Sequence, residues 1–214
     1  MPLLPDKVRK QVEVGFKDLK EPVNLKVFTQ EFECPTCGEN HNLMDEVAQI
    51  SEKIRIEVYD FVADEDVVET YKIDKIPATV VEGREDCGIR FYGVPNGYEF
   101  TTLIEAIRIV SQGDSMLSPK TRKKLKSLSK PVHLQVLITP TCPYCASAVN
   151  MAHRMAVESE LITADMIETI EFPYLTNKYN VFAVPKVVIN ETIEFEGALP
   201  ESDFLKHIMK AGKQ

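Results

Sequence analysis

Cys34-Pro35-Thr36-Cys37 and Cys142-Pro143-Tyr144-Cys145 are two Cys-x-x-Cys motifs, 108 positions apart in a chain of 214 residues. Two thiols at this spacing can close a disulfide in place and open it again, so each motif is a candidate redox centre. Four of the five cysteines of the chain lie in these motifs. This usage favours redox chemistry over a structural role for the cysteines.

A proline preceded by an apolar residue follows each motif at the same distance. Pro77 of Ile76-Pro77 lies 43 residues after Cys34, and Pro185 of Val184-Pro185 lies 43 residues after Cys142. A cis bond before proline costs far less than elsewhere, so we predict that both bonds are cis and form sharp turns. Beside the cysteines, such a turn would leave the backbone of the preceding residue able to pair with an extended substrate.

Both motifs belong to an internal duplication with a period near 108 residues. Tyr71-x-Ile73-x-x-Ile76-Pro77 matches Tyr179-x-Val181-x-x-Val184-Pro185, and Phe91-x-Gly93 matches Phe195-x-Gly197. A period of this length indicates a duplicated domain rather than a solenoid repeat.

Each half has the same expected order of elements. A helix, a strand, the cysteine turn, a helix opened by the first cysteine, a second strand and another helix lead to the proline, before two short strands and a last helix. In the second half, the first two strands are expected at 132–138 and about 165–170. Such strand–helix–strand units favour parallel pairing. We predict an α/β fold with two domains, residues 1–115 and 116–214, each a mixed β-sheet flanked by helices.

Disulfide exchange needs a thiolate nucleophile, an accessible sulfur atom and a second thiol that resolves the mixed disulfide. The start of a helix stabilises a thiolate through its unpaired N–H groups and its dipole. We therefore predict that Cys34 and Cys142 are the nucleophiles and that Cys37 and Cys145 are the resolving thiols. Tyr144 gives the second motif a larger apolar surface for substrate than the threonine at the same place in the first.

The charge near the two nucleophiles differs. Glu31 and Glu33 precede Cys34, whereas the three residues before Cys142 carry no charge. Nearby carboxylates oppose thiolate formation, so we predict that Cys142 is the more reactive nucleophile.

Together these features resemble the thioredoxin/glutaredoxin superfamily, and residues 142–145 have the glutaredoxin active-site sequence. The tandem arrangement is similar to that of the protein disulfide oxidoreductases of hyperthermophilic archaea and bacteria, over about residues 5–210. The resemblance implies two thioredoxin folds and reductase, oxidase and isomerase activities on protein disulfides. It also implies that electrons come from NADPH through a thioredoxin reductase, a flavoenzyme, with no organic cofactor bound to this chain.

The chain departs from thioredoxin in the proton acceptor, because Phe28 and Val136 stand where thioredoxin buries an aspartate. Glu57 and Glu168 are candidates for that role, since each lies in an otherwise apolar second strand. Burial there would raise the pKa of the carboxyl toward neutrality, which suits proton transfer. The alternative is an exposed carboxylate at a sheet edge or strand end. We favour Glu168, because its neighbours two positions away are apolar.

Composition limits the partners. The net charge of −8 and the pI near 5.1 argue against nucleic acid and anionic membranes as partners. The longest apolar runs fall short of 18 residues, so we expect no membrane span. Charged residues throughout positions 1–20 argue against a secretory signal, and we expect a cytoplasmic protein whose substrates are proteins with disulfides or dithiols.

Two other functions remain open. One is a glutaredoxin-like electron donor dedicated to a single enzyme, such as a peroxidase. The other is a zinc-binding scaffold, in which Cys34, Cys37 and His41 would be ligands; no fourth ligand is evident, and we expect no metal site. The basic run at 120–130 is predicted to be a solvated helix face, with a docking patch for an acidic partner as the alternative.

Overall fold

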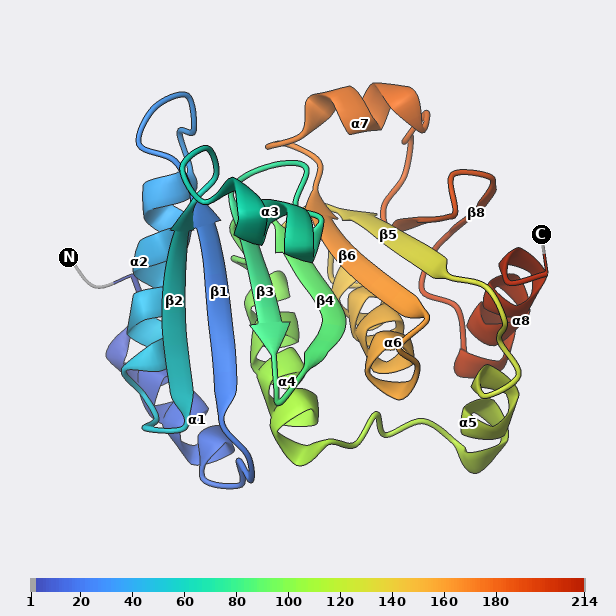
Figure 1. Ribbon diagram of the computed structural model, residues 1–214, viewed down its shortest axis with the longest axis horizontal. Coiled ribbons are helices and arrows are strands. Elements are labelled where there is room, and N and C mark those ends of the chain that lie inside the picture. Colours follow the sequence, from blue (N-terminus) through green and yellow to red (C-terminus); the bar gives the residue numbers. More distant parts are fainter. Residues whose placement is uncertain (1–2, 214) are drawn as a thin grey trace.

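The computed structural model describes residues 3–213, and its elements follow the predicted repeat (Figure 1). The first half contains α1 (Asp6–Phe16), β1 (Val23–Thr29), α2 (Cys37–Ala48), β2 (Ile54–Asp60), α3 (Glu65–Tyr71), β3 (Ala78–Glu82), β4 (Asp86–Tyr92) and α4 (Glu99–Gln112). The second half contains α5 (Pro119–Leu125), β5 (Val132–Ile138), α6 (Cys145–Glu158), β6 (Ile162–Glu168), α7 (Pro173–Lys178), β7 (Lys186–Ile189), β8 (Ile193–Glu196) and α8 (Glu201–Ala211).

The strands of both halves form one eight-stranded mixed sheet in the order β2-β1-β3-β4-β6-β5-β7-β8. In each half a parallel pair, β1–β2 or β5–β6, is followed by antiparallel pairs that end in the predicted hairpin. The halves join because β4 pairs in parallel with β6, from Ile89↔Ala164 to Tyr92↔Ile167. The predicted α/β fold with two thioredoxin-like halves is confirmed, whereas the domain boundary after residue 115 stays a prediction.

Two hydrophobic cores cover the two faces of the sheet. The larger core packs α1, α2, α4, α6 and α8 against side chains such as Leu25, Val136 and Met166. The smaller core packs α3 and α7 against the opposite face, where Phe28, Leu137 and Ile167 point. Because successive side chains of a strand point to opposite faces, apolar runs such as Val132–Ile138 supply both cores at once.

Some element boundaries differ from those predicted. The helices α2 and α6 begin at the second cysteine of each motif, so the first cysteine lies in the turn before the helix. The strand β6 starts at Ile162 and ends at Glu168, so Ile170 does not share a strand face with Glu168 and is exposed in the following turn. Among residues 3–213, no helix is long and apolar enough to cross a bilayer.

His153 of α6 is buried where the two halves meet. Its ring lies edge-on to that of Phe91 in β4, with 4.9 Å between the centroids. Burial lowers the pKa of His153 to about 3. The folded protein therefore holds this imidazole in its neutral form over the range in which an unfolded chain takes up a proton.

Stability should decrease as the pH falls because of this histidine. Below about pH 6.5 the unfolded chain binds a proton at His153 that the folded chain refuses until about pH 3, so the loss accumulates as the pH falls through this window. Between pH 7 and pH 5 the contribution to the free energy of unfolding should fall by about 2 kcal/mol. In urea denaturation at both pH values, the free energy of unfolding of His153→Phe should decrease between pH 7 and pH 5 by about this much less than that of the wild type.

The same substitution at His207 is the matched control, because that ring also packs on a phenylalanine, with 4.7 Å between the centroids of His207 and Phe195. An equal loss of stability between pH 7 and pH 5 in the wild type and His153→Phe would contradict the assignment.

Candidate active site

The two cysteine motifs have the same geometry. Each pair forms a disulfide, with Cα–Cα distances of 5.4 Å for Cys34–Cys37 and 5.5 Å for Cys142–Cys145. The first cysteine of each pair is partly exposed, whereas Cys37 and Cys145 are buried at 1% and 0% exposure. A reagent or substrate disulfide can therefore reach the first sulfur of each pair and not the second. This difference in access agrees with the predicted nucleophile and resolving thiol, roles that stay predictions.

A tight turn joins the two cysteines of each pair, and the helix begins at the second cysteine. The N–H of Cys37 donates to the carbonyl of Cys34 at 3.4 Å, and the N–H of Cys145 donates to that of Cys142 at 3.3 Å. The first N–H groups of a helix have no partner within the helix, so both centres lie where a thiolate is stabilised, although the helix starts later than predicted.

Both predicted cis bonds are confirmed, at Ile76-Pro77 and Val184-Pro185. In the second half, the sulfur of Cys142 lies 3.6 Å from the carbonyl oxygen of Val184, which places this turn beside the cysteines. The carbonyl of each proline accepts a hydrogen bond from the glycine after the hairpin, from Gly93 at 3.0 Å and from Gly197 at 2.8 Å. The repeated glycine thus ties the hairpin to the proline turn.

The prediction that Glu57 is buried and has a raised pKa is wrong. Its strand β2 is the outer strand of the sheet, and its side chain is 41% exposed. Hydrogen bonds from Lys26 at 2.7 Å and from the Tyr59 hydroxyl at 2.5 Å lower the pKa of Glu57 rather than raise it. The predicted alternative, an exposed carboxylate at a sheet edge, describes this residue.

Glu168 is buried as expected, but the burial comes from the neighbouring strands rather than from apolar residues on its own strand face. It is the last residue of β6, which lies between β4 and β5, and it is 3% exposed. Burial raises the pKa of Glu168, opposed by hydrogen bonds from the N–H groups of Ile170 and Glu171. Its Oε1 atom has no hydrogen-bond partner among residues 3–213, so this oxygen is able to accept a proton.

Glu171 is a site residue that was not predicted from the sequence. It comes from the second half, and its Oε2 accepts a hydrogen bond from the hydroxyl of Thr36 in the first motif. Its Oε1 accepts a hydrogen bond from the N–H of Val94 at 2.7 Å. The repeat holds no signal for this contact, because it depends on how β4 and β6 pair across the two halves.

Large apolar side chains are exposed around both centres. We call them the apolar rim: Phe32, Tyr98, Tyr144, Ile170 and Phe182. Phe32 and Phe182 lie two residues before Cys34 and Val184, and Ile170 adjoins Glu171. The N–H of Tyr98 donates to the carbonyl of Pro140, two residues before Cys142, at 3.1 Å. Only Tyr144 was predicted, because it lies inside a motif.

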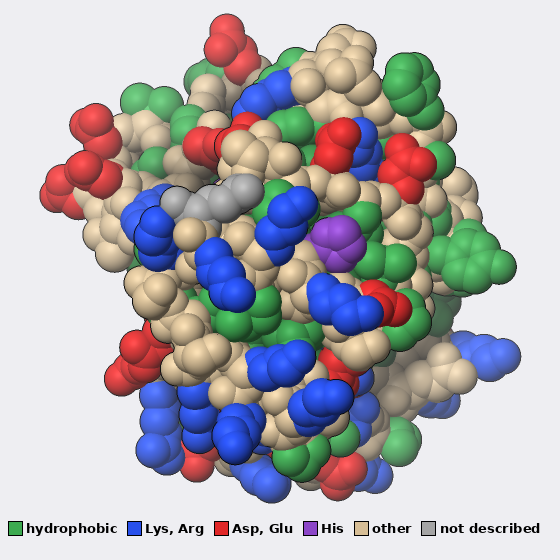
Figure 2. Space-filling model, turned by 90° about the vertical axis from the view of Figure 1, so that its right-hand side faces the viewer, with side chains coloured by type: hydrophobic (Ala, Val, Ile, Leu, Met, Phe, Trp, Pro, Cys, Tyr) green, Lys and Arg blue, Asp and Glu red, His purple; other side chains and the backbone are tan. Residues whose placement is uncertain are grey.

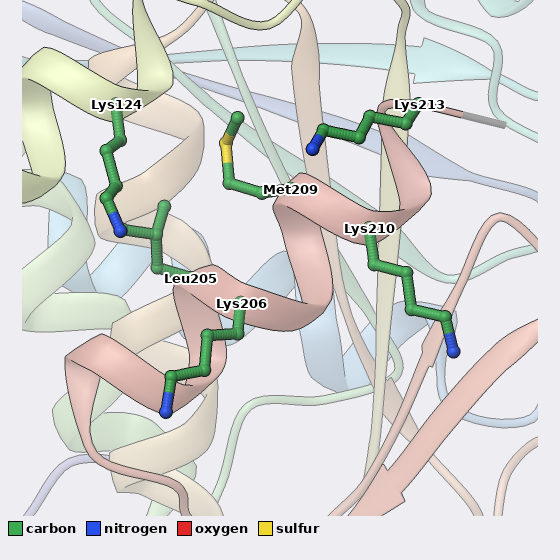
Figure 3. Close-up of a pocket in the computed structure, with 6 residues that line it drawn as sticks. All are labelled: Lys124, Leu205, Lys206, Met209, Lys210 and Lys213. Atoms are coloured by element: carbon green, nitrogen blue, oxygen red, sulfur yellow. The ribbon is translucent and has the colours of Figure 1, made fainter.

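A shallow groove of about 390 Å³ lies on another face, where Lys and Arg side chains gather (Figure 2). Leu205 and Met209 of α8 lie between the lysine side chains that line this groove (Figure 3). Its lining residues are Lys124, Leu205, Lys206, Met209, Lys210 and Lys213. No cysteine lines it, and the lysines of α5 are exposed, as both the predicted solvated helix face and its alternative, a docking patch for an acidic partner, require. Among residues 3–213, no group of three His, Cys, Asp or Glu side chains could hold a metal ion.

Comparison with protein-family models matches residues 132–210 to a thioredoxin domain. Comparison with solved structures extends the likeness to the whole chain. A protein disulfide oxidoreductase from Aeropyrum pernix K1 is 30% identical, with a TM-score of 0.93 over 98% of this chain and 94% of that one. The F subunit of alkyl hydroperoxide reductase from Enterococcus faecalis has the same fold, with a TM-score of 0.90 at 24% identity, over 96% of this chain and 99% of that chain.

Curated relatives match over part of their length. NADH dehydrogenase of Bacillus subtilis is 31% identical over 149 residues, which are 69% of this chain and 27% of that protein. The F subunit of alkyl hydroperoxide reductase of Staphylococcus epidermidis is 31% identical over 121 residues, 56% of this chain and 24% of that protein. The chain thus spans about a quarter of the length of these relatives.

Proposed function

This chain belongs to the tandem thioredoxin-fold protein disulfide oxidoreductases, and on that premise we propose that it reduces, forms and isomerises disulfide bonds of other proteins at both cysteine centres. The observation that carries the proposal is the division within each pair. An accessible sulfur precedes a buried one by three residues, at the start of a helix.

The reaction uses two thiolate attacks. The thiolate of Cys34 or Cys142 attacks one sulfur of a substrate disulfide, which forms a mixed disulfide and releases the other substrate sulfur as a thiolate that takes up a proton. The thiolate of Cys37 or Cys145 then attacks the sulfur of its partner cysteine and releases the second substrate thiol. The substrate gains two electrons and two protons, and the centre is left oxidised. Reversal of both steps oxidises a substrate dithiol.

The buried thiol must lose its proton before the second attack. Glu168 is our candidate acceptor in the second half, because it is buried, its pKa is raised and one of its oxygens lacks a hydrogen-bond partner among residues 3–213. A carboxyl with a raised pKa exchanges protons more readily near neutral pH than an ordinary one. Glu57 is no longer a candidate on this ground, because it is exposed and paired with Lys26.

The substrates we propose are polypeptides with exposed apolar segments. The apolar rim supports this choice, because its exposed side chains lie near the centres in the chain or next to residues that contact them, and a small disulfide would not need them. The cis turns supply backbone groups for an extended chain, as the Val184 carbonyl beside Cys142 illustrates. Tyr144, Ile76 and Val184 thus keep their predicted role at the substrate-binding surface as part of this proposal.

The proposed partner that restores the dithiol is a flavoenzyme of the thioredoxin reductase type, which draws electrons from NADPH while this chain binds no organic cofactor. The curated relatives support a reductase partner, since they extend well beyond the matched region and one is named NADH dehydrogenase. NADH is therefore the alternative electron source.

Phe182→Ser should slow the reduction of insulin several-fold and leave the reduction of a small aromatic disulfide unchanged. The side chain of Phe182 is 91% exposed and lies two residues before Val184, so its loss removes apolar contact with a polypeptide and no contact within the fold. Burial of such a side chain against a partner is worth about 1.5–3 kcal/mol, and part of that would appear in kcat/KM. In both assays the protein is first reduced with dithiothreitol and separated from excess reagent, and a single turnover with the substrate disulfide is followed.

Val14→Ser is the matched control, because Val14 is 64% exposed on α1 and belongs to no centre. Equal slowing of both substrates by Phe182→Ser would contradict a role in polypeptide binding.

The second candidate function is an electron donor dedicated to one enzyme, which the relatives named as the F subunit of alkyl hydroperoxide reductase favour. Substrate range separates the two proposals. A general oxidoreductase reduces insulin and several unrelated disulfide proteins at similar rates, whereas a dedicated donor reduces one peroxide-reducing partner and leaves these proteins largely oxidised.

A further inference from the structure

A carboxylate from the second half holds the turn of the first redox centre. Thr36 lies between the two cysteines of the first motif and is the cap residue of α2, yet its hydroxyl makes no hydrogen bond to that helix. The hydroxyl donates instead to Oε2 of Glu171. The cysteine turn of one half is therefore tied directly to a side chain of the other.

Glu171 is fixed by two further hydrogen bonds. The N–H of Val94 donates to its Oε1, and its own N–H donates to Oε2 of the buried Glu168, both at 2.7 Å. Each oxygen of the Glu171 carboxylate thus has a defined donor, and its backbone is anchored at the end of β6. A side chain held in this way keeps its charge in one place beside the motif.

The same carboxylate reaches the segment that contacts the first proline turn. Gly93 donates its N–H to the carbonyl of Pro77 at 3.0 Å and has a φ of 92°. A Cβ atom at this position would lie 2.7 Å from Oε1 of Glu171, so only glycine allows the carboxylate to approach. Glu171 consequently links the two segments that flank the first centre, the cysteine turn and the strand end behind Pro77.

The second centre has no equivalent among residues 3–213. Gly197 repeats Gly93 and also bonds to its proline, but a Cβ atom there would meet nothing within 4 Å. Tyr144 replaces Thr36 and is 70% exposed. The pairing of β4 with β6 therefore adds a carboxylate to the first centre alone.

We propose that Glu171 is a positioning residue for the first centre, which disfavours the thiolate of Cys34 and makes this centre a weaker oxidant than the second. The proposal rests on the proposed function, since it concerns the redox chemistry of the same cysteines. A fixed negative charge opposes formation of a second one nearby. A less stable thiolate makes the dithiol form less favourable relative to the disulfide, which lowers the reduction potential.

The charged residues within five positions of Cys34 in the chain are also carboxylates. Glu31 and Glu33 precede it in the chain and are exposed, so solvent and salt screen them. Glu39 lies in the first turn of α2 and is exposed as well. Glu171 is half-buried, and its position is fixed by hydrogen bonds. Its effect on Cys34 should therefore exceed that of the exposed carboxylates.

Glu171→Gln tests the charge with little change in shape, because the amide keeps an oxygen that accepts a hydrogen bond. The substitution is placed in a Cys142→Ser, Cys145→Ser background, where only the first centre remains. The rate of Cys34 alkylation by iodoacetamide is measured against pH. The pKa of Cys34 should fall by about half a unit to one unit, so alkylation at pH values below it should be about three- to tenfold faster. The fraction of the first centre that is reduced in a given glutathione buffer should also increase, because a more stable thiolate favours the dithiol form.

Thr36→Val examines the hydrogen bond itself. It removes the donor and keeps the shape, so Glu171→Gln should have a smaller effect in the Thr36→Val background than in the parent. Such coupling is the signature of two residues that act together. Equal effects of Glu171→Gln with and without the Thr36 hydroxyl would count against the contact as the origin of the shift.

Two controls separate this inference from general effects. Glu160→Gln removes one charge from an exposed position, and it should leave the Cys34 profile unchanged. Glu39→Gln, which removes an exposed charge from the first turn of α2, should shift the pKa of Cys34 less than Glu171→Gln does. An identical Cys34 profile in Glu171→Gln and its parent overturns the inference. If the parent fails to exchange disulfides with glutathione, the proposed function fails at this centre, while alkylation still tests Glu171.

Discussion

Serine at both Cys34 and Cys142 should reduce the rate of insulin reduction to that of dithiothreitol alone. A serine hydroxyl is not ionised near neutral pH, and oxygen cannot form the mixed disulfide on which the exchange depends. The two accessible sulfurs are the proposed entry points for electrons, and the buried Cys37 and Cys145 cannot replace them. The assay follows the turbidity of insulin as its chains separate.

Variants with one intact centre should keep activity of the same order as the wild type. Each half has its own cysteine pair, proline turn and hairpin glycine, so neither centre requires the cysteines of the other. Cys34→Ser with Cys37→Ser leaves the second centre, and Cys142→Ser with Cys145→Ser leaves the first. Complete loss of activity in either variant, with unchanged circular dichroism, would show that the centres operate only together.

Gly88→Ala should destabilise the protein by about 3–4 kcal/mol, which combines the cost of a positive φ with that of a backbone shift. Gly88 lies in β4 with a φ of 73°. A Cβ atom there would press directly against the carbonyl oxygen of Ile162 and lie 3.3 Å from Cα of Thr163, both in β6. Since these are backbone atoms of the neighbouring strand, they cannot move aside without opening the junction of the two halves.

Gly113→Ala is the matched control, because Gly113 has a similar φ of 62° and a Cβ atom there would have open space around it. It should lose only about 1–2 kcal/mol, the cost of the positive φ itself. Urea denaturation measures both variants. Equal losses at the two glycines would show that the contact between β4 and β6 carries no special constraint.

The local features of the candidate site could be predicted from sequence because they repeat. The cysteine spacing, the proline 43 residues later and the glycine after the hairpin recur in both halves and indicate the same fold twice. The cis bonds, the buried second cysteine and the parallel strand pair of each half agree with that prediction. Each depends on residues within one half, where the chain itself limits the geometry.

Glu57 and Glu168 show where such prediction ends. Both lie in the second strand of their half, and their local sequences gave similar reasons to expect burial. The structure separates them, because β2 is an outer strand of the sheet, whereas β6 is covered on its far side by β4 of the other half. Alternating side chains determine which face of a sheet a residue occupies, but not whether another strand lies beside it.

The contact between Thr36 and Glu171 has the same origin. These residues are 135 positions apart and become neighbours only because β4 and β6 pair in one register. The sequence by itself therefore determined two thioredoxin-like halves with two redox-active cysteine pairs, since short-range spacing and repetition specify them. The tertiary structure alone decided that the two sheets join, that Glu168 is buried and that Glu171 of the second half contacts the first centre. The physical reason is that pairing between the distant strands β4 and β6 produces no repeated pattern in the sequence of either half.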